Sequence, residues 1–179
     1  MKADSTAMAD STAKAMAAAP AMAPAPAPLT DANILGMLDE LNAADSTTGA
    51  LAATKGTMPA VKSFGKDMER DHHKLRAAGQ ALAKKINVTP ATPAGDTIPA
   101  MAQKIGDNLT SMAKGAEWDK AYIDGEVSVH QFVLSFLQSA ETAATDSSLK
   151  AAITSATPII QGHLMQAQAI QTKLNAAKP

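Results

Sequence analysis

Residues 64–75 read FGKDMERDHHKL, and this stretch decides the fold because apolar residues recur in and around it every three or four positions. That spacing marks one face of an α-helix. The two adjacent histidines lie on different faces. His72 lies on the apolar row, whereas His73 lies with Glu69 and Arg70 on a charged face. The apolar row consists of Val61, Phe64, Gly65, Met68, His72, Leu75, Gly79, Leu82 and Ile86.

His72 is therefore expected to point into a helical core, where two roles are open. A lone core imidazole is most often a hydrogen-bonded structural residue. An imidazole among other histidines and carboxylates is a candidate metal ligand. The choice depends on which side chains the rest of the chain brings to it.

Outward from this stretch, the same periodicity predicts an all-α protein. The long helices are expected over about 31–56, 58–86 and 117–144, and from the cap at Thr145-Asp146 to about 175. A short helix is expected over about 98–113, where no long apolar stripe is present, so we expect it to pack across the others. Pro158 should kink or interrupt the last helix. This order predicts an up-down-up-down four-helix bundle with an extra short helix between its second and third long helices.

The composition excludes several classes of function. Sixteen Lys and Arg residues nearly balance 17 Asp and Glu residues, and no basic stripe suggests a nucleic-acid partner. No apolar run approaches the roughly 20 residues of a transmembrane helix. The absence of cysteine excludes a disulfide framework and a thiolate nucleophile. No phosphate-binding loop or nucleophile–base arrangement stands out, so no catalytic or organic-cofactor residue is predicted.

Residues 1–29 differ from the remainder of the chain. They are rich in Ala, Pro and Met and low in complexity, which predicts a flexible tether before a helical domain at 30–179. They lack the uninterrupted apolar core of a signal peptide. The alternative is an arm that docks on another subunit or on an envelope partner.

Four polar residues occupy or adjoin inward-facing positions: Asp45, His72, His130 and His163. By helix rise, Asp45 lies about 18 Å before the first turn and His72 about 21 Å after it. His130 lies about 22 Å before the last turn and His163 about 25 Å after it. Each helix pair therefore places its polar residues at nearly one level.

Two explanations of this coincidence stay open. The residues form a hydrogen-bonded structural cluster, or they bind a transition metal with Glu126 or Tyr122 as outer-shell partners. Imidazole and carboxylate ligands suit Zn, Fe, Mn or Cu and do not select among them. A diiron carboxylate centre is disfavoured because the required second Glu-x-x-His is missing, with Ile160 standing before His163.

Four segments carry a family resemblance: DSTTGALA at 45–52, VKSFGKDMERDH at 61–72, WDKAYI at 118–123 followed by His130, and TPIIQGHL at 157–164. With them, residues from about 32 to 169 resemble the bacterial domain of unknown function 4142 family, described as ferritin-like exported or outer-membrane proteins. The resemblance implies a ferritin-like bundle in the periplasm or cell envelope with inward histidines at 72, 130 and 163. The family usually has Glu where this chain has Asp45.

These observations lead to two hypotheses. The first is an exported, non-enzymatic ferritin-like bundle that binds Zn, Fe, Mn or Cu through Asp45, His72, His130 and His163. The second is a structural or interaction protein of the cell envelope, self-assembling through residues 1–29, in which the histidines are only structural.

Overall fold

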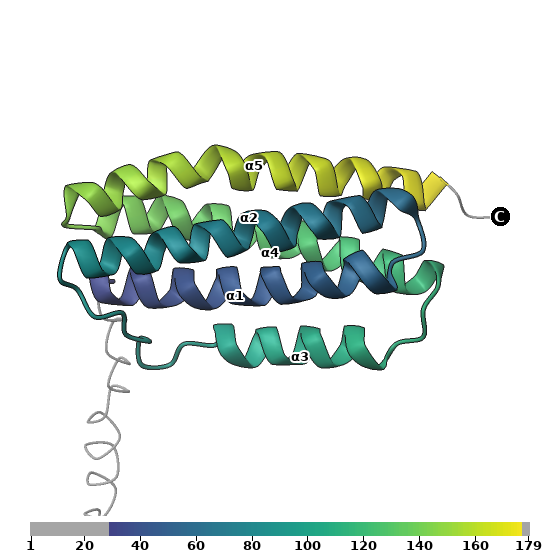
Figure 1. Cartoon of the computed structure of the whole chain (residues 1–179), viewed down its shortest axis with the longest axis horizontal. Coiled ribbons are helices and arrows are strands. Elements are labelled where there is room, and N and C mark those ends of the chain that lie inside the picture. Colours follow the sequence, from purple (N-terminus) through teal and green to yellow (C-terminus); the bar gives the residue numbers. More distant parts are fainter. Residues whose placement is uncertain (1–28, 177–179) are drawn as a thin grey trace, which may run out of the picture.

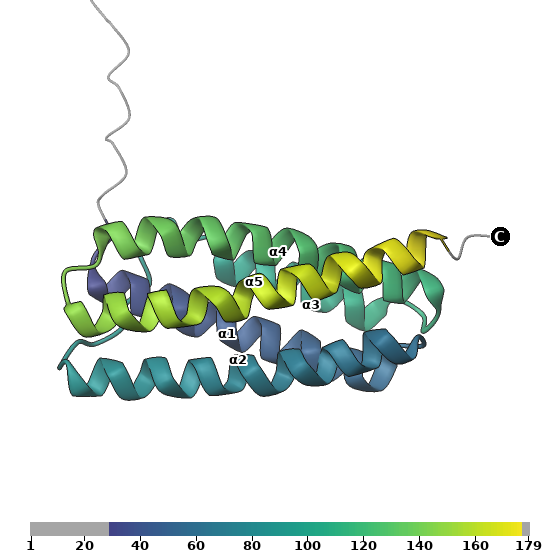
Figure 2. The same cartoon turned by 90° about the horizontal axis from the view of Figure 1, so that it is seen from above.

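The computed structural model describes residues 29–176, which form five helices and no strand. The helices are α1 (Asp31–Lys55), α2 (Pro59–Lys85), α3 (Ile98–Ser111), α4 (Ala116–Ala143) and α5 (Ser147–Ala176). The predicted all-α class is confirmed. The four long helices lie side by side along the longest axis, with α3 on the outside next to α1 and α4 (Figures 1 and 2).

The ends of the helices follow local sequence signals. The Thr30 hydroxyl accepts a hydrogen bond from the Asn33 amide at 3.2 Å, and the Asn33 side chain accepts one from the Thr30 amide at 3.3 Å. This reciprocal pair satisfies two amides that the first turn of α1 leaves free. Pro59 occupies the first turn of α2, where its missing amide costs nothing. Asp146 accepts from the Ser148 and Leu149 amides at the start of α5.

The helix directions correct the predicted up-down-up-down order. Asp31, at the start of α1, accepts hydrogen bonds from Thr145 and Asp146 in the α4–α5 turn. Asp119, at the start of α4, accepts from Thr57 and Met58 in the α1–α2 turn. The start of α4 therefore lies beside the start of α2, so α2 and α4 run parallel, as Figure 1 also shows.

The segment that contains α3 explains why α2 and α4 run in the same direction. It runs along the length of the molecule and returns the chain to the opposite end before α4 begins (Figure 1). The expectation that α3 packs across the other helices was therefore wrong. Its inner side carries an apolar stripe that the sequence reading missed, and a stripe along the helix axis is covered best by lying lengthwise. The stripe consists of Ile98, Met101, Ala102, Ile105 and Leu109.

The α3 segment is held at both ends by hydrogen bonds. Before it, the Ala91 amide donates to the Ala32 carbonyl at 3.0 Å. At its end, the Leu109 carbonyl accepts from both the Lys55 ammonium at 2.8 Å and the Trp118 indole at 2.7 Å. The crossover therefore has a fixed place on α1 and α4.

The closest helix contact lies between α1 and α2, where two glycines face each other. A Cβ built on Gly49 would lie 2.8 Å from the Gly65 carbonyl oxygen, and one built on Gly65 would lie 2.7 Å from the Gly49 carbonyl oxygen. Only residues without a side chain allow the two backbones to approach this closely. The pair fixes the separation of α1 and α2 on the turn side of the buried polar residues.

Pro158 does not interrupt α5, which continues from Ser147 to Ala176. Buried Ile153 and Ile160 anchor the helix on either side of the proline. The predicted interruption is therefore corrected: apolar burial before and after Pro158 outweighs the loss of one backbone hydrogen bond.

Two apolar clusters make up the core, and a polar layer separates them. On α2, Met68 belongs to one cluster and Leu75 packs against the other, with His72 between them. On α5, Ile160 and Ala167 flank His163 in the same way. The buried polar residues at this level are Asn42, Asp45, Thr48, His72, Glu126, His130 and His163.

No helix in the 29–176 region combines the length and the apolarity needed to cross a membrane. The predictions made for residues 1–28, a tether or docking arm, lie outside the described residues.

The glycine contact gives a stability test. Gly65→Ala should lower the free energy of unfolding by about 2 kcal/mol, because the new methyl group would press on the backbone of α1. Gly79→Ala on the same helix is the matched control. It meets nothing within 4 Å and should raise stability by about 0.5–1 kcal/mol through helix propensity. Urea unfolding followed by circular dichroism measures both, and equal effects would refute the close-packing account.

Candidate metal centre

Three histidines from three helices meet in the middle of the fold. His72 lies on α2, His130 on α4 and His163 on α5. The centres of their rings form a nearly equilateral triangle with sides of 5.2, 5.5 and 5.5 Å. One nitrogen from each ring lies within 4.8 Å of the other two. The structure thus brings together three of the four predicted ligands.

The protonation of His72 follows from its neighbour Asn42. The Asn42 side-chain amide donates to the Leu38 carbonyl at 2.7 Å, so its carbonyl oxygen faces His72. That oxygen lies 2.9 Å from Nδ1 of His72 and can only accept a hydrogen bond. The Nδ1 atom of His72 therefore carries the proton, and Nε2 keeps its lone pair.

The other two rings are fixed in the same way. Nδ1 of His130 lies 2.9 Å from the backbone carbonyl of Glu126, which is an acceptor only. Nε2 of His163 lies 3.3 Å from a carboxylate oxygen of Asp71. A hydrogen bond from Arg70 lowers the pKa of Asp71 to about 2, so this carboxylate is ionised and accepts. Nε2 of His130 and Nδ1 of His163 are left with lone pairs.

The three lone-pair nitrogens are also the ones without a partner. Nε2 of His72, Nε2 of His130 and Nδ1 of His163 are buried and make no hydrogen bond within the described part of the chain. The set of one nitrogen from each ring that lies within 4.8 Å would be at most about 2.8 Å from a common centre. Closing on a metal at about 2.0–2.1 Å therefore needs movements of under about 1 Å.

Burial keeps these imidazoles neutral. It lowers the pKa of His72 to about 3, with the neighbouring His130 and His163 rings adding to the shift. It lowers the pKa of His130 to about 4 and also lowers that of His163. A neutral ring with a free nitrogen is the form that binds a metal, so the metal would not need to displace protons at pH 7.

Asp45 takes a different place from the one expected for a ligand. Its carboxylate lies on the protonated side of His72, with Oδ2 at 3.6 Å from Nδ1. The group of three nitrogens does not include it. Burial raises the pKa of Asp45 to about 7. From this position the carboxylate can influence the unprotonated Nε2 of His72 only through the ring.

Glu126 and Tyr122 lie next to Asp45 rather than next to the free nitrogens. Glu126 Oε2 is 3.4 Å from Nδ1 of His130, again on the protonated side of a ring. Burial, with the charge of Asp45 second, raises the pKa of Glu126 well above its usual value. Burial and the nearby carboxylates of Glu126 and Asp45 also raise the pKa of Tyr122. These three residues form an acidic group behind the histidines.

Two residues that hold the rings were not predicted. Asn42 orients His72, and Asp71 orients His163. A signal for Asn42 was present, since it stands three positions before Asp45 on the same inward side of α1. Asp71 precedes His72 directly, but nothing in its position predicts contact with a histidine 92 residues away.

The arrangement is suited to holding a transition-metal ion. Three neutral imidazoles, each with its second nitrogen bonded to an acceptor, match the usual environment of histidine ligands. Such a nitrogen set suits Cu, Zn or Fe better than Mg or Ca.

Comparisons with known proteins agree with an all-helical fold. The family described as "Domain of unknown function (DUF4142)" matches residues 11–170. Comparison with curated proteins gave no match. A solved structure, "CopM in the Cu(II)-bound form", is similar with a TM-score of 0.66 and 14% sequence identity, covering 82% of this chain and 99% of that chain. At this identity the similarity concerns the fold alone.

The lowered pKa of His72 predicts how the stability of the metal-free protein depends on pH. The unfolded chain takes up a proton near pH 6.5, whereas folded His72 does so only near pH 3. Between these values the unfolded state binds more protons, so stability falls as pH falls. The raised pKa of Asp45 has the opposite effect below pH 7, so the comparison must be made between variants.

Urea unfolding between pH 4.5 and 6.5 should therefore show a steeper loss of stability with falling pH for the wild type than for His72→Asn. The difference should approach about 1.4 kcal/mol per pH unit. His73→Asn, on the exposed face, should keep the wild-type slope. Equal slopes for all three proteins would contradict the burial of a neutral His72.

Proposed function

Because the chain belongs to the domain of unknown function 4142 family, whose description assigns no activity, we propose a function from the chain's own residues. The protein binds one transition-metal ion through His72, His130 and His163. The observation that carries this proposal is the convergence of three neutral imidazoles whose free nitrogens are buried without a partner.

The cost of leaving these nitrogens unpaired supports a ligand. A buried polar atom without a hydrogen bond costs about 1–3 kcal/mol. Three of them together would take up a large share of the roughly 5–15 kcal/mol that stabilises a typical domain. A metal ion satisfies all three at once, whereas hydrogen bonds already occupy the outer nitrogens.

Copper is the first metal to test, followed by zinc, iron and manganese. Imidazole binds Cu(II) strongly in the general order of divalent metals. The similar structure described as CopM is named in a Cu(II)-bound form, which supports the choice without assigning copper to this chain.

We place the other predicted site residues in the outer shell. Asp45 faces the protonated nitrogen of His72 at 3.6 Å, and Glu126 faces that of His130 at 3.4 Å. The hydrogen bonds that orient these rings go to Asn42 and to the Glu126 backbone carbonyl, so the two carboxylates act on the rings through their charge. Tyr122 adjoins both carboxylates and influences the ligands through them.

The proposal includes a ferritin-like four-helix bundle and an exported location. Long helices joined by one long crossover are the ferritin-like connection, and here α3 lies within that crossover. A periplasmic or envelope location rests on the family resemblance, and fractionation of the native cells tests it. The proposal is limited to metal binding and assigns no catalytic step to the triad.

Metal analysis of untagged protein tests the proposal. The wild type should bind about one Cu(II) per chain, and His72→Ala, His130→Ala and His163→Ala should each weaken binding by about a hundredfold or more. This loss exceeds the roughly 10–100-fold typical of an outer-shell change. Elemental analysis measures the number of Cu(II) ions per chain, and a titration followed by the electron paramagnetic resonance spectrum of Cu(II) measures the strength of binding.

His73→Ala is the matched control, because His73 is the exposed neighbour of His72 and should leave binding unchanged. Cu(II) at 100 times its Kd should also stabilise the wild type by about 2.7 kcal/mol. If no metal binds after exposure to Cu, Zn, Fe and Mn, the histidines are structural and the alternative of an envelope interaction protein replaces this proposal.

A further inference from the structure

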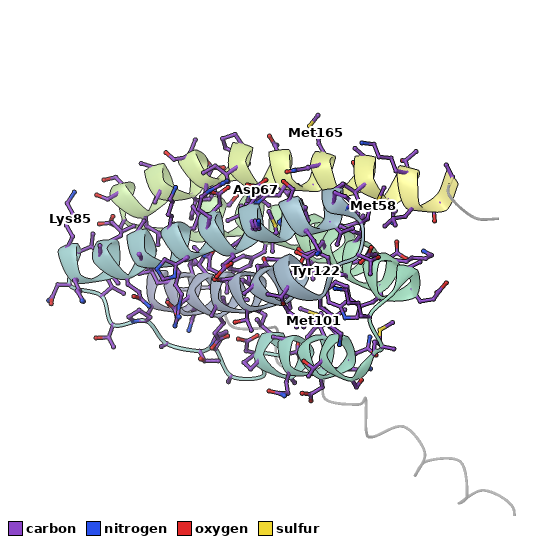
Figure 3. The ribbon with its side chains drawn as sticks, turned by 45° about the vertical axis from the view of Figure 1, so that its right-hand side comes forward. Met58, Asp67, Lys85, Met101, Tyr122 and Met165 are labelled. Atoms are coloured by element: carbon purple, nitrogen blue, oxygen red, sulfur yellow. The ribbon has the colours of Figure 1, made fainter. Side chains whose placement is uncertain are left out.

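A cavity with a partly polar lining lies beneath α3, on the side of His72 and His130 that carries their protonated nitrogens. It has a volume of about 40 Å³, is lined by residues of α1, α3 and α4, and is partly open to solvent beside the exposed Met101. Its apolar wall comes largely from the inner stripe of α3, and Figure 3 shows Met101 of α3 and Tyr122 of α4 in this region. Its polar lining consists of Asp45, Thr48, Tyr122 and Glu126.

The polar lining is almost completely shielded from solvent and only partly hydrogen-bonded. Asp45 and Glu126 are each 5% exposed, and Tyr122 is 1% exposed. Oδ2 of Asp45, Oε2 of Glu126 and the Tyr122 hydroxyl have no hydrogen-bond partner among residues 29–176. Among these side chains the Thr48 hydroxyl is the donor, at 3.3 Å to Oε1 of Glu126 and at 3.3 Å to the backbone carbonyl of Asp45.

No positive side chain balances the two carboxylates. Every described residue that lines the cavity, other than the four polar ones, is apolar or glycine. Two buried carboxylates without a counter-charge are strongly disfavoured in the ionised form. The site therefore requires either protons or a cation.

We propose that this cavity is a second metal site, which binds a hard divalent cation of the Mn²⁺ or Mg²⁺ class through the carboxylates of Asp45 and Glu126. The hydroxyls of Tyr122 and Thr48 supply neutral oxygen ligands. Oxygen ligands with two negative charges suit Mn²⁺ or Mg²⁺, whereas the nitrogen triad suits Cu or Zn. The cavity is large enough for one ion or one water molecule.

The two sites are chemically distinct but adjacent. The carboxylates of the cavity face the protonated nitrogens of His72 and His130 at 3.6 and 3.4 Å. A cation between Asp45 and Glu126 would draw their negative charge away from these rings. Occupation of the cavity should then weaken metal binding at the triad, and the reverse effect must be equal.

Mn²⁺ alone is the probe, and it is titrated at pH 8 into full-length His163→Asn protein. This variant removes one ring of the triad, and His163 does not line the cavity. Electron paramagnetic resonance of free Mn²⁺ should show about one bound ion per chain. Adding Glu126→Gln or Asp45→Asn to this variant should weaken binding by about tenfold or more, because each removes a buried carboxylate ligand and its charge.

Glu117→Gln is the matched control, since Glu117 is an exposed residue of α4 and its charge lies outside the cavity. Circular dichroism verifies that every variant is folded, and Asp45→Asn replaces Glu126→Gln if the latter unfolds. Absence of Mn²⁺ binding at millimolar concentration would mean that the carboxylates hold only protons and would overturn the proposal. The wild type and the single variant Glu126→Gln are titrated in parallel. If both bind Mn²⁺ and His163→Asn does not, the ion belongs to the triad and the proposal is overturned.

Discussion

The rest of the structure depends on a layer of buried polar side chains that crosses the apolar core at its middle. Each long helix contributes to this layer, and apolar residues resume on both sides of it. Six of its atoms are buried without a partner in the described region, although burial of such atoms is costly. These atoms belong to Asp45, His72, Tyr122, Glu126, His130 and His163. A core built only for stability would be apolar here, so the polar layer lowers the stability of the fold, as expected if the layer serves the metal binding proposed above.

The layer has two halves with opposite chemistry. On one half, hydrogen bonds fix the tautomers so that three nitrogens present lone pairs to a common centre. On the other half, carboxylates and hydroxyls line the cavity beneath α3. The protonated nitrogens of His72 and His130 lie between the halves. In the two sites proposed above, each of these rings would therefore have one nitrogen in the triad and its second nitrogen next to the carboxylates.

The sequence predicted both the helices and the meeting of the histidines. The reasons for the helices were right, whereas one premise for the histidines was wrong. The long helices follow from strong apolar periodicity and clear caps, such as Thr30 and Asp146. The comparison of levels along the helices requires the α1–α2 turn and the α4–α5 turn to lie at the same end of the molecule. Because α2 and α4 run parallel, these turns lie at opposite ends (Figure 1). The histidines still meet because His72 and His130 lie near the midpoints of their helices, where direction does not change the level. Asp71 could not be predicted because its contact with His163 joins residues 92 positions apart and leaves no local pattern. Asn42 and the apolar stripe of α3 do leave local signals of burial, but those signals do not identify the segment that each one contacts.

The reciprocal caps of Asp31 and Asp119 have a further consequence for how the two helical hairpins can be aligned. Each aspartate begins a helix of one hairpin and satisfies the turn of the other, in the manner of a two-fold symmetric interface within a single chain. Sliding one hairpin by a single helical turn, about 5.4 Å, would break both caps and separate the imidazoles at the same time. The two hairpins therefore have a single favourable alignment along the helix axis. The hydrogen bonds at the ends of the molecule thus help to fix the distances between the imidazoles at its centre.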